Sequence, residues 1–155
     1  MFAGQIQGHV HASSELCLVD DGTSAIGFTS CASSSRVYGE HEIVLFEREL
    51  TNYGGYYNTQ TSSFICPVDV VYIFTLTINV DIADVVVCIM RNDVELTDSW
   101  AWTDNELYTQ ATNKVVTERL AGDVVWPRVS YSNGSGEIRS SSGYTKLSAV
   151  LTKAI

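Results

Sequence analysis

The most regular feature of the chain is an alternation of apolar and mixed positions between residues 68 and 82. Successive side chains of a β-strand point to opposite faces, so every second residue lies on the same face. One face of this segment carries only apolar or aromatic side chains: Val68, Val70, Tyr72, Phe74, Leu76, Ile78, Val80 and Ile82. The other face mixes valine and isoleucine with aspartate, threonine and asparagine. The pattern predicts one long strand with a single fully buried face.

Shorter apolar segments recur along the chain, with turn residues between them. Strands are predicted at 25–31, 43–46, 85–91, 115–120, 124–130, 138–142 and 147–152. Short strands separated by glycine, asparagine and aspartate turns are typical of a β-sandwich or barrel. No long segment shows the apolar spacing of an amphipathic helix. We therefore predict an all-β fold.

Residues 1–24 show no clear periodicity and end in a turn sequence, Asp-Asp-Gly-Thr-Ser, at 20–24. A length of 155 residues fits one domain. We predict an N-terminal extension over 1–24 and a single globular domain over 25–155. The first residues have neither the basic stretch nor the apolar core of a signal peptide. We expect either a protein that is not exported or a mature form with a start methionine.

The composition narrows the range of partners. Hydrophobic residues make up 45% of the chain and charged residues 17%, so a packed core is expected and intrinsic disorder is not. The formal net charge is −9 and only three lysines are present. Nucleic acid binding needs a dense patch of lysine and arginine. No apolar run approaches the roughly 20 residues that span a bilayer. We expect neither nucleic acid binding nor membrane insertion.

Four cysteines, Cys17, Cys31, Cys66 and Cys88, are widely spaced and form no C-x-x-C pair. This excludes the common zinc-ribbon and thioredoxin motifs. An even number of cysteines is compatible with two disulfides in an oxidising compartment, and four cysteines allow three pairings. Buried free thiols are the alternative.

No recognisable catalytic motif is present, so we do not expect an enzyme. The sequence lacks a zinc-protease helix motif, a glycine-rich phosphate loop and a nucleophile elbow. His9 and His11 would share one face of a strand, but such a pair near a terminus is more often incidental than a metal site. The many aspartates and glutamates fall at turns, where local backbone bonding explains them. No metal or other cofactor is predicted.

The residues that best fit ligand binding are two tryptophans in a polar segment. Trp100 and Trp102 lie two residues apart and are followed by Asp104. An aromatic face can pack on the C–H side of a pyranose while nearby polar groups bind its hydroxyls. Tyr108 is a weaker candidate of the same kind. The alternative is that the tryptophan pair fills the core or a subunit interface, and Trp126 is expected in the core.

Two arginines are the candidate groups for an acidic ligand. A guanidinium can bind a carboxylate through two parallel hydrogen bonds, as recognition of sialic acid would require. Arg128 and Arg139 are the candidates, and Ser141 adds a hydroxyl beside Arg139. The alternative is a surface ion pair between each arginine and one of the 18 acidic residues.

Five short motifs occur in the order found in one known family. Residues 64–67 read Phe-Ile-Cys-Pro and are followed by Tyr-Ile-Phe at 72–74. The other motifs are the segments at 25–29, 52–57, 90–92 and 120–126. Together they resemble the globular domain of the C1q family over roughly residues 25–152. Residues 145–151, Thr-Lys-Leu-Ser-Ala-Val-Leu, differ from the aromatic motif that usually ends this domain.

The resemblance implies a fold, an assembly and a set of disulfides. The fold is a jelly-roll β-sandwich related to tumour necrosis factor, with roughly ten antiparallel strands in two sheets. The assembly is a homotrimer. The position of the family's cysteines implies a Cys66–Cys88 disulfide, which leaves Cys17–Cys31 as the second. Calcium bound near the trimer apex is compatible with the family but is not predicted.

The resemblance also implies a function. The chain resembles the stalkless C1q-like lectins of invertebrates, so we expect a secreted pattern-recognition protein that binds glycans or glycoproteins. Sialic acid or another acidic or acylated sugar is the expected ligand. The alternative is a protein-binding module like those of complement or the adipokines, which would bind a receptor or immune protein through its loops. A structural or storage role for the trimer is a third alternative.

Overall fold

A computed structural model describes residues 25–155 except 82, 104–107, 135, 141–142 and 153–155. The predicted N-terminal extension, residues 1–24, lies outside the described residues. Twelve strands are present in the described part of the chain. They are β1 (Gly27–Cys31), β2 (Arg36–Val37), β3 (Arg48–Tyr53), β4 (Tyr57–Asn58), β5 (Ser63–Ile65), β6 (Val70–Asp81), β7 (Asp84–Arg91), β8 (Val94–Trp102), β9 (Tyr108–Arg119), β10 (Val124–Ser132), β11 (Glu137–Ile138) and β12 (Lys146–Leu151).

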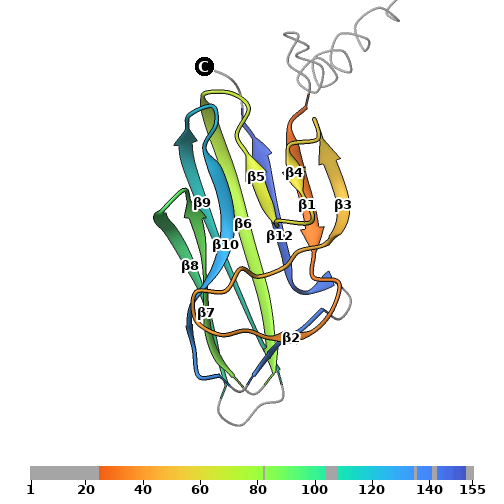
Figure 1. The fold of residues 1–155 in the computed structure, drawn as a ribbon, viewed down its shortest axis with the longest axis vertical. Coiled ribbons are helices and arrows are strands. Elements are labelled where there is room, and N and C mark those ends of the chain that lie inside the picture. The colour runs from red at the N-terminus through yellow and green to blue at the C-terminus, as the bar shows by residue number, and fades with distance from the viewer. Residues whose placement is uncertain (1–24, 82, 104–107, 135, 141–142, 153–155) are drawn as a thin grey trace, which may run out of the picture.

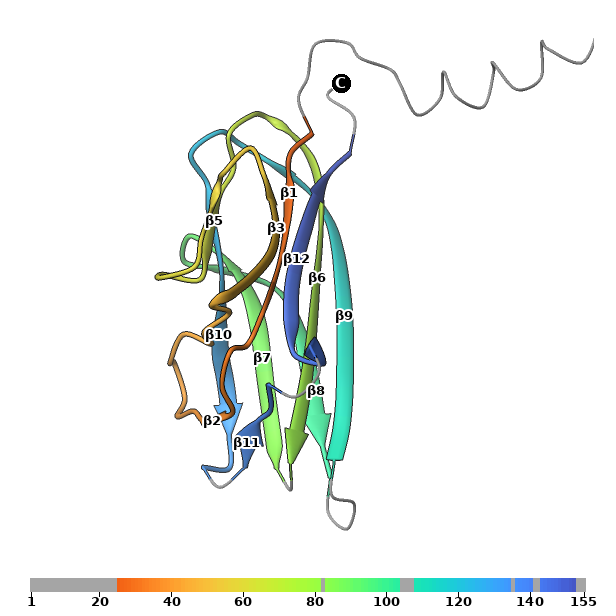
Figure 2. The same cartoon turned by 90° about the vertical axis from the view of Figure 1, so that its right-hand side faces the viewer.

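These strands form two sheets that face each other, as Figures 1 and 2 show. Sheet A has the order β2-β11-β6-β12-β1-β3, and β9 pairs with β6 along its whole length. Sheet B has the order β4-β5-β10-β7-β8. All the strand pairings are antiparallel. The prediction of an all-β jelly-roll sandwich in two antiparallel sheets is confirmed.

The core lies between the sheets and is built around the long strand. β6 covers most of the segment predicted from its alternation, and the side chains of Tyr72, Phe74 and Leu76 are fully buried. Phe28 of β1 stacks on Tyr57 of β4 with 4.1 Å between ring centroids. Aromatic rings from both sheets thus interlock across the core, as expected of a well-packed sandwich.

Three strand predictions need correction. Among the described residues of the predicted strand at 138–142, only Ile138 lies in a strand, β11. The predicted strand at 43–46 is instead a short edge segment that bonds to β10, with one bridge between Ile43 and Arg128. The predicted strand at 115–120 is only the second half of β9, which begins at Tyr108. The first half of β9 escaped prediction because its residues, Tyr-Thr-Gln-Ala-Thr-Asn-Lys, are mostly polar and exposed.

The two ends of the sandwich are formed by different parts of the chain. The described chain begins and ends at one end, at the top of Figures 1 and 2. The β6–β7 connection lies at the opposite end, together with β11. Asp81, Tyr108 and Arg139 come together at this distal end, because β6 ends where β9 begins.

Candidate functional site

The outward face of sheet B carries the exposed tryptophan that the sequence singled out. In β7, Val85, Val87 and Ile89 belong to the core, so Val86 and Cys88 face away from it. Trp100 of β8 lies opposite Val86, and so does Tyr131 of β10. We call these three residues, Trp100, Val86 and Tyr131, the Trp100 row. Trp100 is 65% exposed and Tyr131 44% exposed, so the row offers two aromatic side chains to solvent.

The indole of Trp100 is held in place by a hydrogen bond. Its Nε1 donates to Oδ1 of Asp84 over 2.6 Å. Trp102 pairs directly with Asp84 at the end of the same strand and is 56% exposed. Both tryptophans therefore lie on the surface, and the alternative that they fill the core is wrong. Asp104, the polar neighbour predicted beside them, lies outside the described residues.

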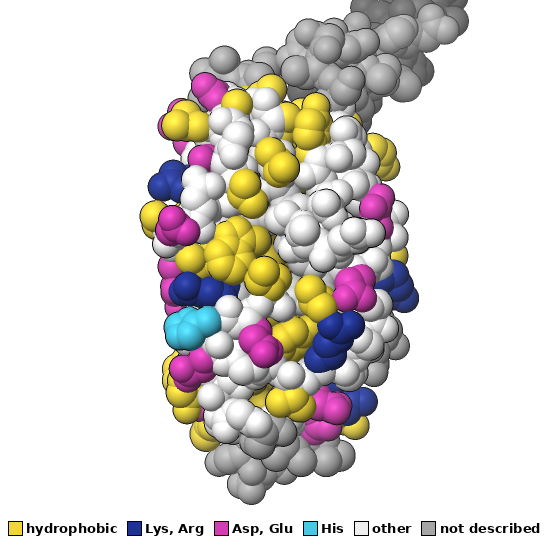
Figure 3. All heavy atoms as spheres, viewed as in Figure 1, with side chains coloured by type: hydrophobic (Ala, Val, Ile, Leu, Met, Phe, Trp, Pro, Cys, Tyr) yellow, Lys and Arg dark blue, Asp and Glu magenta, His cyan; other side chains and the backbone are white. Residues whose placement is uncertain are grey.

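A charged row crosses sheet B next to the Trp100 row. Arg128 of β10, Cys88 of β7 and Asp98 of β8 are cross-strand neighbours. Arg128 forms a 3.7 Å ion pair with Glu95, so its charge is partly balanced. Burial and the hydrogen bond to Glu95 raise the pKa of Asp98 to about 6. Hydrophobic side chains and both signs of charge are interspersed on the face that Figure 3 shows.

The prediction that Trp126 lies in the core is wrong. Its neighbours Val125 and Val129 belong to the core, whereas Trp126 lies opposite Met90 on the outward face of sheet B. Its Nε1 donates to the backbone oxygen of Asn92 over 3.0 Å. Residues 124–129 have apolar side chains on both faces of the strand, so the sequence pattern did not reveal which face is buried.

Tyr108 and Arg139 meet at the distal end of sheet A, although they are 31 positions apart in the sequence. The Arg139 guanidinium carbon lies 4.5 Å from the centroid of the Tyr108 ring, which is a cation–π arrangement. Its Nη1 donates to Oδ2 of Asp81 over 3.0 Å. Ser141, predicted beside Arg139, lies outside the described residues. The sequence did not point to Asp81 or Tyr144 as members of this cluster. The β6–β9 register pairs Asp81 with Tyr108, and Tyr144, which precedes β12, accepts a hydrogen bond from Gln110 of β9 through its backbone oxygen.

Five of the seven predicted binding residues are described in the structure, and these five divide between two places. Trp100, Trp102 and Arg128 lie on the outward face of sheet B, whereas Tyr108 and Arg139 lie at the distal end of sheet A. The predicted surface ion pairs are present at both arginines. Each guanidinium therefore already has a carboxylate partner within the chain.

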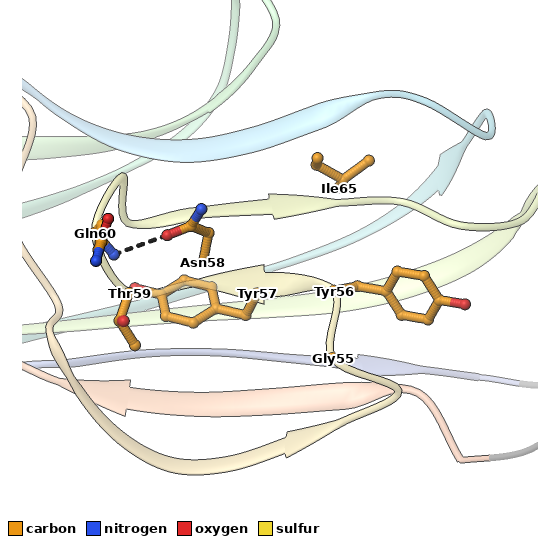
Figure 4. Close-up of a pocket in the computed structure, with 7 residues that line it drawn as sticks. All are labelled: Gly55, Tyr56, Tyr57, Asn58, Thr59, Gln60 and Ile65. Carbon is orange, nitrogen blue, oxygen red and sulfur yellow. Dashed lines mark hydrogen bonds between the residues drawn. The ribbon is translucent and has the colours of Figure 1, made fainter.

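A hollow lies near the β4–β5 turn, and Figure 4 shows its lining residues. Its volume is about 540 Å³, and its lining runs from Gly55 to Gln60 and includes Ile65. Tyr57 points into the core, whereas Tyr56 points away from it and is 39% exposed. Asn58 Oδ1 accepts a hydrogen bond from the backbone N–H of Gln60 over 2.9 Å, which closes the turn. The hollow holds no charged side chain among these residues.

The predicted Cys66–Cys88 disulfide is wrong. Cys31, Cys66 and Cys88 are free, buried thiols. Cys66 belongs to the core between the sheets, whereas Cys88 faces outward and its Sγ donates to the backbone oxygen of Arg128 over 3.3 Å. The body of sheet B therefore separates the two sulfurs. Cys17, the predicted partner of Cys31, lies outside the described residues.

Cys66 and Cys88 are also poor nucleophiles and metal ligands. Burial raises the pKa of Cys66 to about 12, so this thiol keeps its proton. Burial, with the negative charge of Glu95, raises the pKa of Cys88 as well. The Cys88 sulfur and carboxylate oxygens of Glu95 and Asp98 lie within 4.8 Å of one another. The Arg128–Glu95 ion pair beside them works against a cation at this position.

No helix in the described part of the chain is long and apolar enough to cross a membrane. A search of curated proteins gave no match. Among solved structures, the globular domain of zebrafish complement 1qA protein is similar, with 15% sequence identity and a TM-score of 0.69. That match covers 84% of this chain and 99% of the other.

Murine APRIL at pH 5.0 is 12% identical with a TM-score of 0.66, over 84% of this chain and all of that chain (100%). Eiger TNF from S. frugiperda is 11% identical with a TM-score of 0.60, over 86% of this chain and 96% of that one. These likenesses establish the fold. The family model for the C1q domain matches residues 27–146, which is most of the chain. The chain therefore belongs to the C1q domain family.

Proposed function

We propose that this protein is a secreted lectin that binds glycans as a homotrimer. The observation that carries the proposal is the Trp100 row on sheet B. Neighbouring strands lie about 4.8 Å apart, so Trp100 and Tyr131 flank Val86 at a spacing of roughly 10 Å. Two exposed aromatic side chains at this spacing offer a shallow surface on which the C–H faces of sugar rings can pack.

Polar groups beside the Trp100 row suit the hydroxyls of a sugar. Asp84 lies at the edge of the Trp100 indole, and the Arg128–Glu95 pair lies one row away. Acceptors and donors therefore stand next to an apolar surface, which is the combination that small polar ligands require. Because Arg128 is already paired, sugar hydroxyls suit this face better than a sugar carboxylate.

A trimer is supported by a second apolar row, on the outward face of sheet A. The cross-strand register places Tyr53, Gly27, Val150, Ile73 and Val116 side by side, one residue from each of five strands. We call this the Val116 row. Tyr53, Val150 and Val116 are 60%, 51% and 63% exposed in the single chain. We propose that further copies of this chain cover the row.

Trimerisation would also explain how shallow sites that each bind a sugar weakly can together bind a glycan surface with higher affinity. A single aromatic row makes few contacts and is expected to bind one sugar weakly. Three copies that engage one surface raise the overall affinity because the second and third contacts form at a high effective concentration.

A glycan array with purified protein tests the proposal. We expect binding that is lost in the Trp100→Ala variant and kept in Leu120→Ala, which removes a similarly exposed apolar side chain at the β9–β10 turn, outside the Trp100 row. Light scattering and thermal unfolding show that each variant keeps its assembly and fold. Absence of binding to every glycan would reject the proposal and favour a protein ligand instead.

A further inference from the structure

The distal end of sheet A contains a small cavity that is separate from the Trp100 row. Its volume is about 210 Å³, and its lining residues are Asn79, Tyr108, Arg139 and Tyr144. Ligand pockets usually measure about 300–1,000 Å³, so this cavity suits one substituent of a sugar better than a whole oligosaccharide. Asn79 lies near the end of β6, Tyr108 begins β9 and Arg139 follows β11. These parts of the chain lie at the end of the sandwich opposite the described termini (Figures 1 and 2).

Arg139 is fixed on several sides in this cavity. Its backbone N–H donates to the backbone oxygen of Asn79 over 2.8 Å. Its guanidinium pairs with Asp81 and lies over the Tyr108 ring. The side chains of Arg139 and Asp81 are only 26% and 28% exposed, so the ion pair is held in a partly desolvated place. A group held this firmly can bind a ligand without a large loss of side-chain entropy.

The charge of Arg139 is balanced before any ligand arrives. A sugar carboxylate at the cavity would gain attraction from Arg139 and lose it through repulsion from Asp81 a few ångströms away. A guanidinium has five N–H donors, however, and one bond to Asp81 leaves donors for an uncharged acceptor. The cavity therefore favours a neutral hydrogen-bonding group over a carboxylate.

The other walls offer aromatic surface and an amide. Tyr108 and Tyr144 are 48% and 51% exposed, so part of each side chain is open to solvent. The backbone oxygen of Tyr144 accepts a hydrogen bond from Gln110 Nε2 over 3.3 Å, which ties this residue to β9. Asn79 contributes a side-chain oxygen and an NH₂ group, an acceptor and two donors.

We infer that this cavity binds the acetamido group of an N-acetylated sugar. The methyl group packs against the tyrosine side chains, the carbonyl oxygen accepts from Arg139, and the N–H donates to the Asn79 side-chain oxygen. All three parts of the group, one apolar and two polar, then have a partner of the right kind. This inference rests on the proposed lectin function and names its ligand class: N-acetylated hexosamines, which are acylated but not acidic, among the acidic or acylated sugars that the sequence analysis expected.

Inhibition of glycan binding by free monosaccharides tests the inference. N-acetylglucosamine and glucose differ only in the acetamido group, and glucosamine separates the effect of the acetyl group from that of the nitrogen. We expect N-acetylglucosamine to inhibit at a concentration about tenfold lower than glucose, the low end of what one methyl-sized apolar contact provides. Tyr144→Ala is expected to remove this difference. Tyr56→Ala is the matched control, because Tyr56 is an exposed tyrosine outside this cavity, the Trp100 row and the Val116 row.

Saturation-transfer NMR on the unmodified protein gives an independent readout. The strongest transfer from protein to N-acetylglucosamine is expected at the acetyl methyl protons, next to the tyrosine rings. A second variant, Asp81→Asn, leaves the charge of Arg139 unbalanced. It is expected to raise affinity for N-acetylneuraminic acid relative to its methyl ester, whereas the unmodified protein should bind the two about equally.

Three results would overturn the inference, and they differ in whether the proposed lectin function is also rejected. Equal inhibition by glucose and N-acetylglucosamine, with binding still lost in Trp100→Ala, would reject the acetamido site and keep the lectin function. A marked preference of the unmodified protein for the free acid over its methyl ester would show that Asp81 does not balance Arg139. Absence of binding to any sugar would reject both the inference and the function on which it rests.

Discussion

Replacing Val116 by glutamate is expected to dissociate the proposed trimer. Val116 is 63% exposed in the single chain and lies at one end of the Val116 row, opposite Ile73. In a trimer that covers this row, the new carboxylate would be buried against apolar side chains. A charge in such a place has lost its hydration and has no partner.

The magnitude follows from the exposed fraction. Fully burying a valine stabilises by about 1.5–3 kcal/mol, so burying the exposed two thirds of Val116 contributes roughly 1–2 kcal/mol per subunit. Over three subunits the loss is roughly 3–6 kcal/mol before the cost of burying the carboxylates is added. At about 1.4 kcal/mol for each factor of ten, the trimer dissociation constant should rise by roughly 10²- to 10⁴-fold or more.

Sedimentation equilibrium over a range of protein concentrations measures this change. The unmodified protein should sediment as a trimer, and Val116→Glu as a monomer at concentrations where the parent is fully assembled. Val94→Glu is the matched control, because Val94 is 51% exposed but lies on sheet B. A Val116→Glu protein that remains as trimeric as the control would refute the assignment of sheet A to the interface.

Three further predictions concern the single chain. Phe74→Ala removes a fully buried ring between the sheets and should lower the free energy of unfolding by about 3–5 kcal/mol in a denaturant titration. Because burial and Glu95 raise the pKa of Asp98 from 3.8 to about 6, the folded state binds a proton that the unfolded state lacks between about pH 4 and pH 6. The free energy of unfolding should therefore fall as pH rises through this window, and Asp98→Asn should flatten that slope; an unchanged slope would contradict the assignment. Since Cys31, Cys66 and Cys88 are free, a reductant should leave the midpoint of thermal unfolding unchanged, and a fall of several degrees would reveal a disulfide.

The fold was largely predictable from the sequence because one long strand shows a clear alternation of apolar and mixed side chains. The alternation at 68–82 identifies both the length of β6 and its buried face. The motif at 64–67 and four others in order then indicate the family. Local pattern was sufficient here because one face of β6 packs on the core along its whole length, while the other face remains mixed.

The orientation of residues in sheet B was not predictable in the same way. Residues 85–90 are apolar on both faces, so the sequence does not show that Cys88 points away from the core. The same ambiguity misplaced Trp126. Where both faces of a strand are fully or partly buried, apolar and polar residues no longer alternate along it. Only the register with the neighbouring strands then determines which face points to the core.

The candidate sites depend on contacts that are distant in sequence. Asp81 and Arg139 are 58 positions apart in the sequence. The β6–β9 register pairs Asp81 with Tyr108, and the β11–β6 pairing brings Arg139 beside them. Sequence reasoning found Tyr108 and Arg139 by residue type but could not find the carboxylate that balances the arginine. That carboxylate changes the expected ligand from an acidic sugar to a neutral one.

The most direct test of a multivalent lectin is binding of the purified protein to one glycan printed at several surface densities. We predict binding that rises steeply with density for the unmodified protein and is much weaker at every density for the monomeric Val116→Glu variant. Equal binding by the trimer and the monomer, or no binding at any density, would contradict the account.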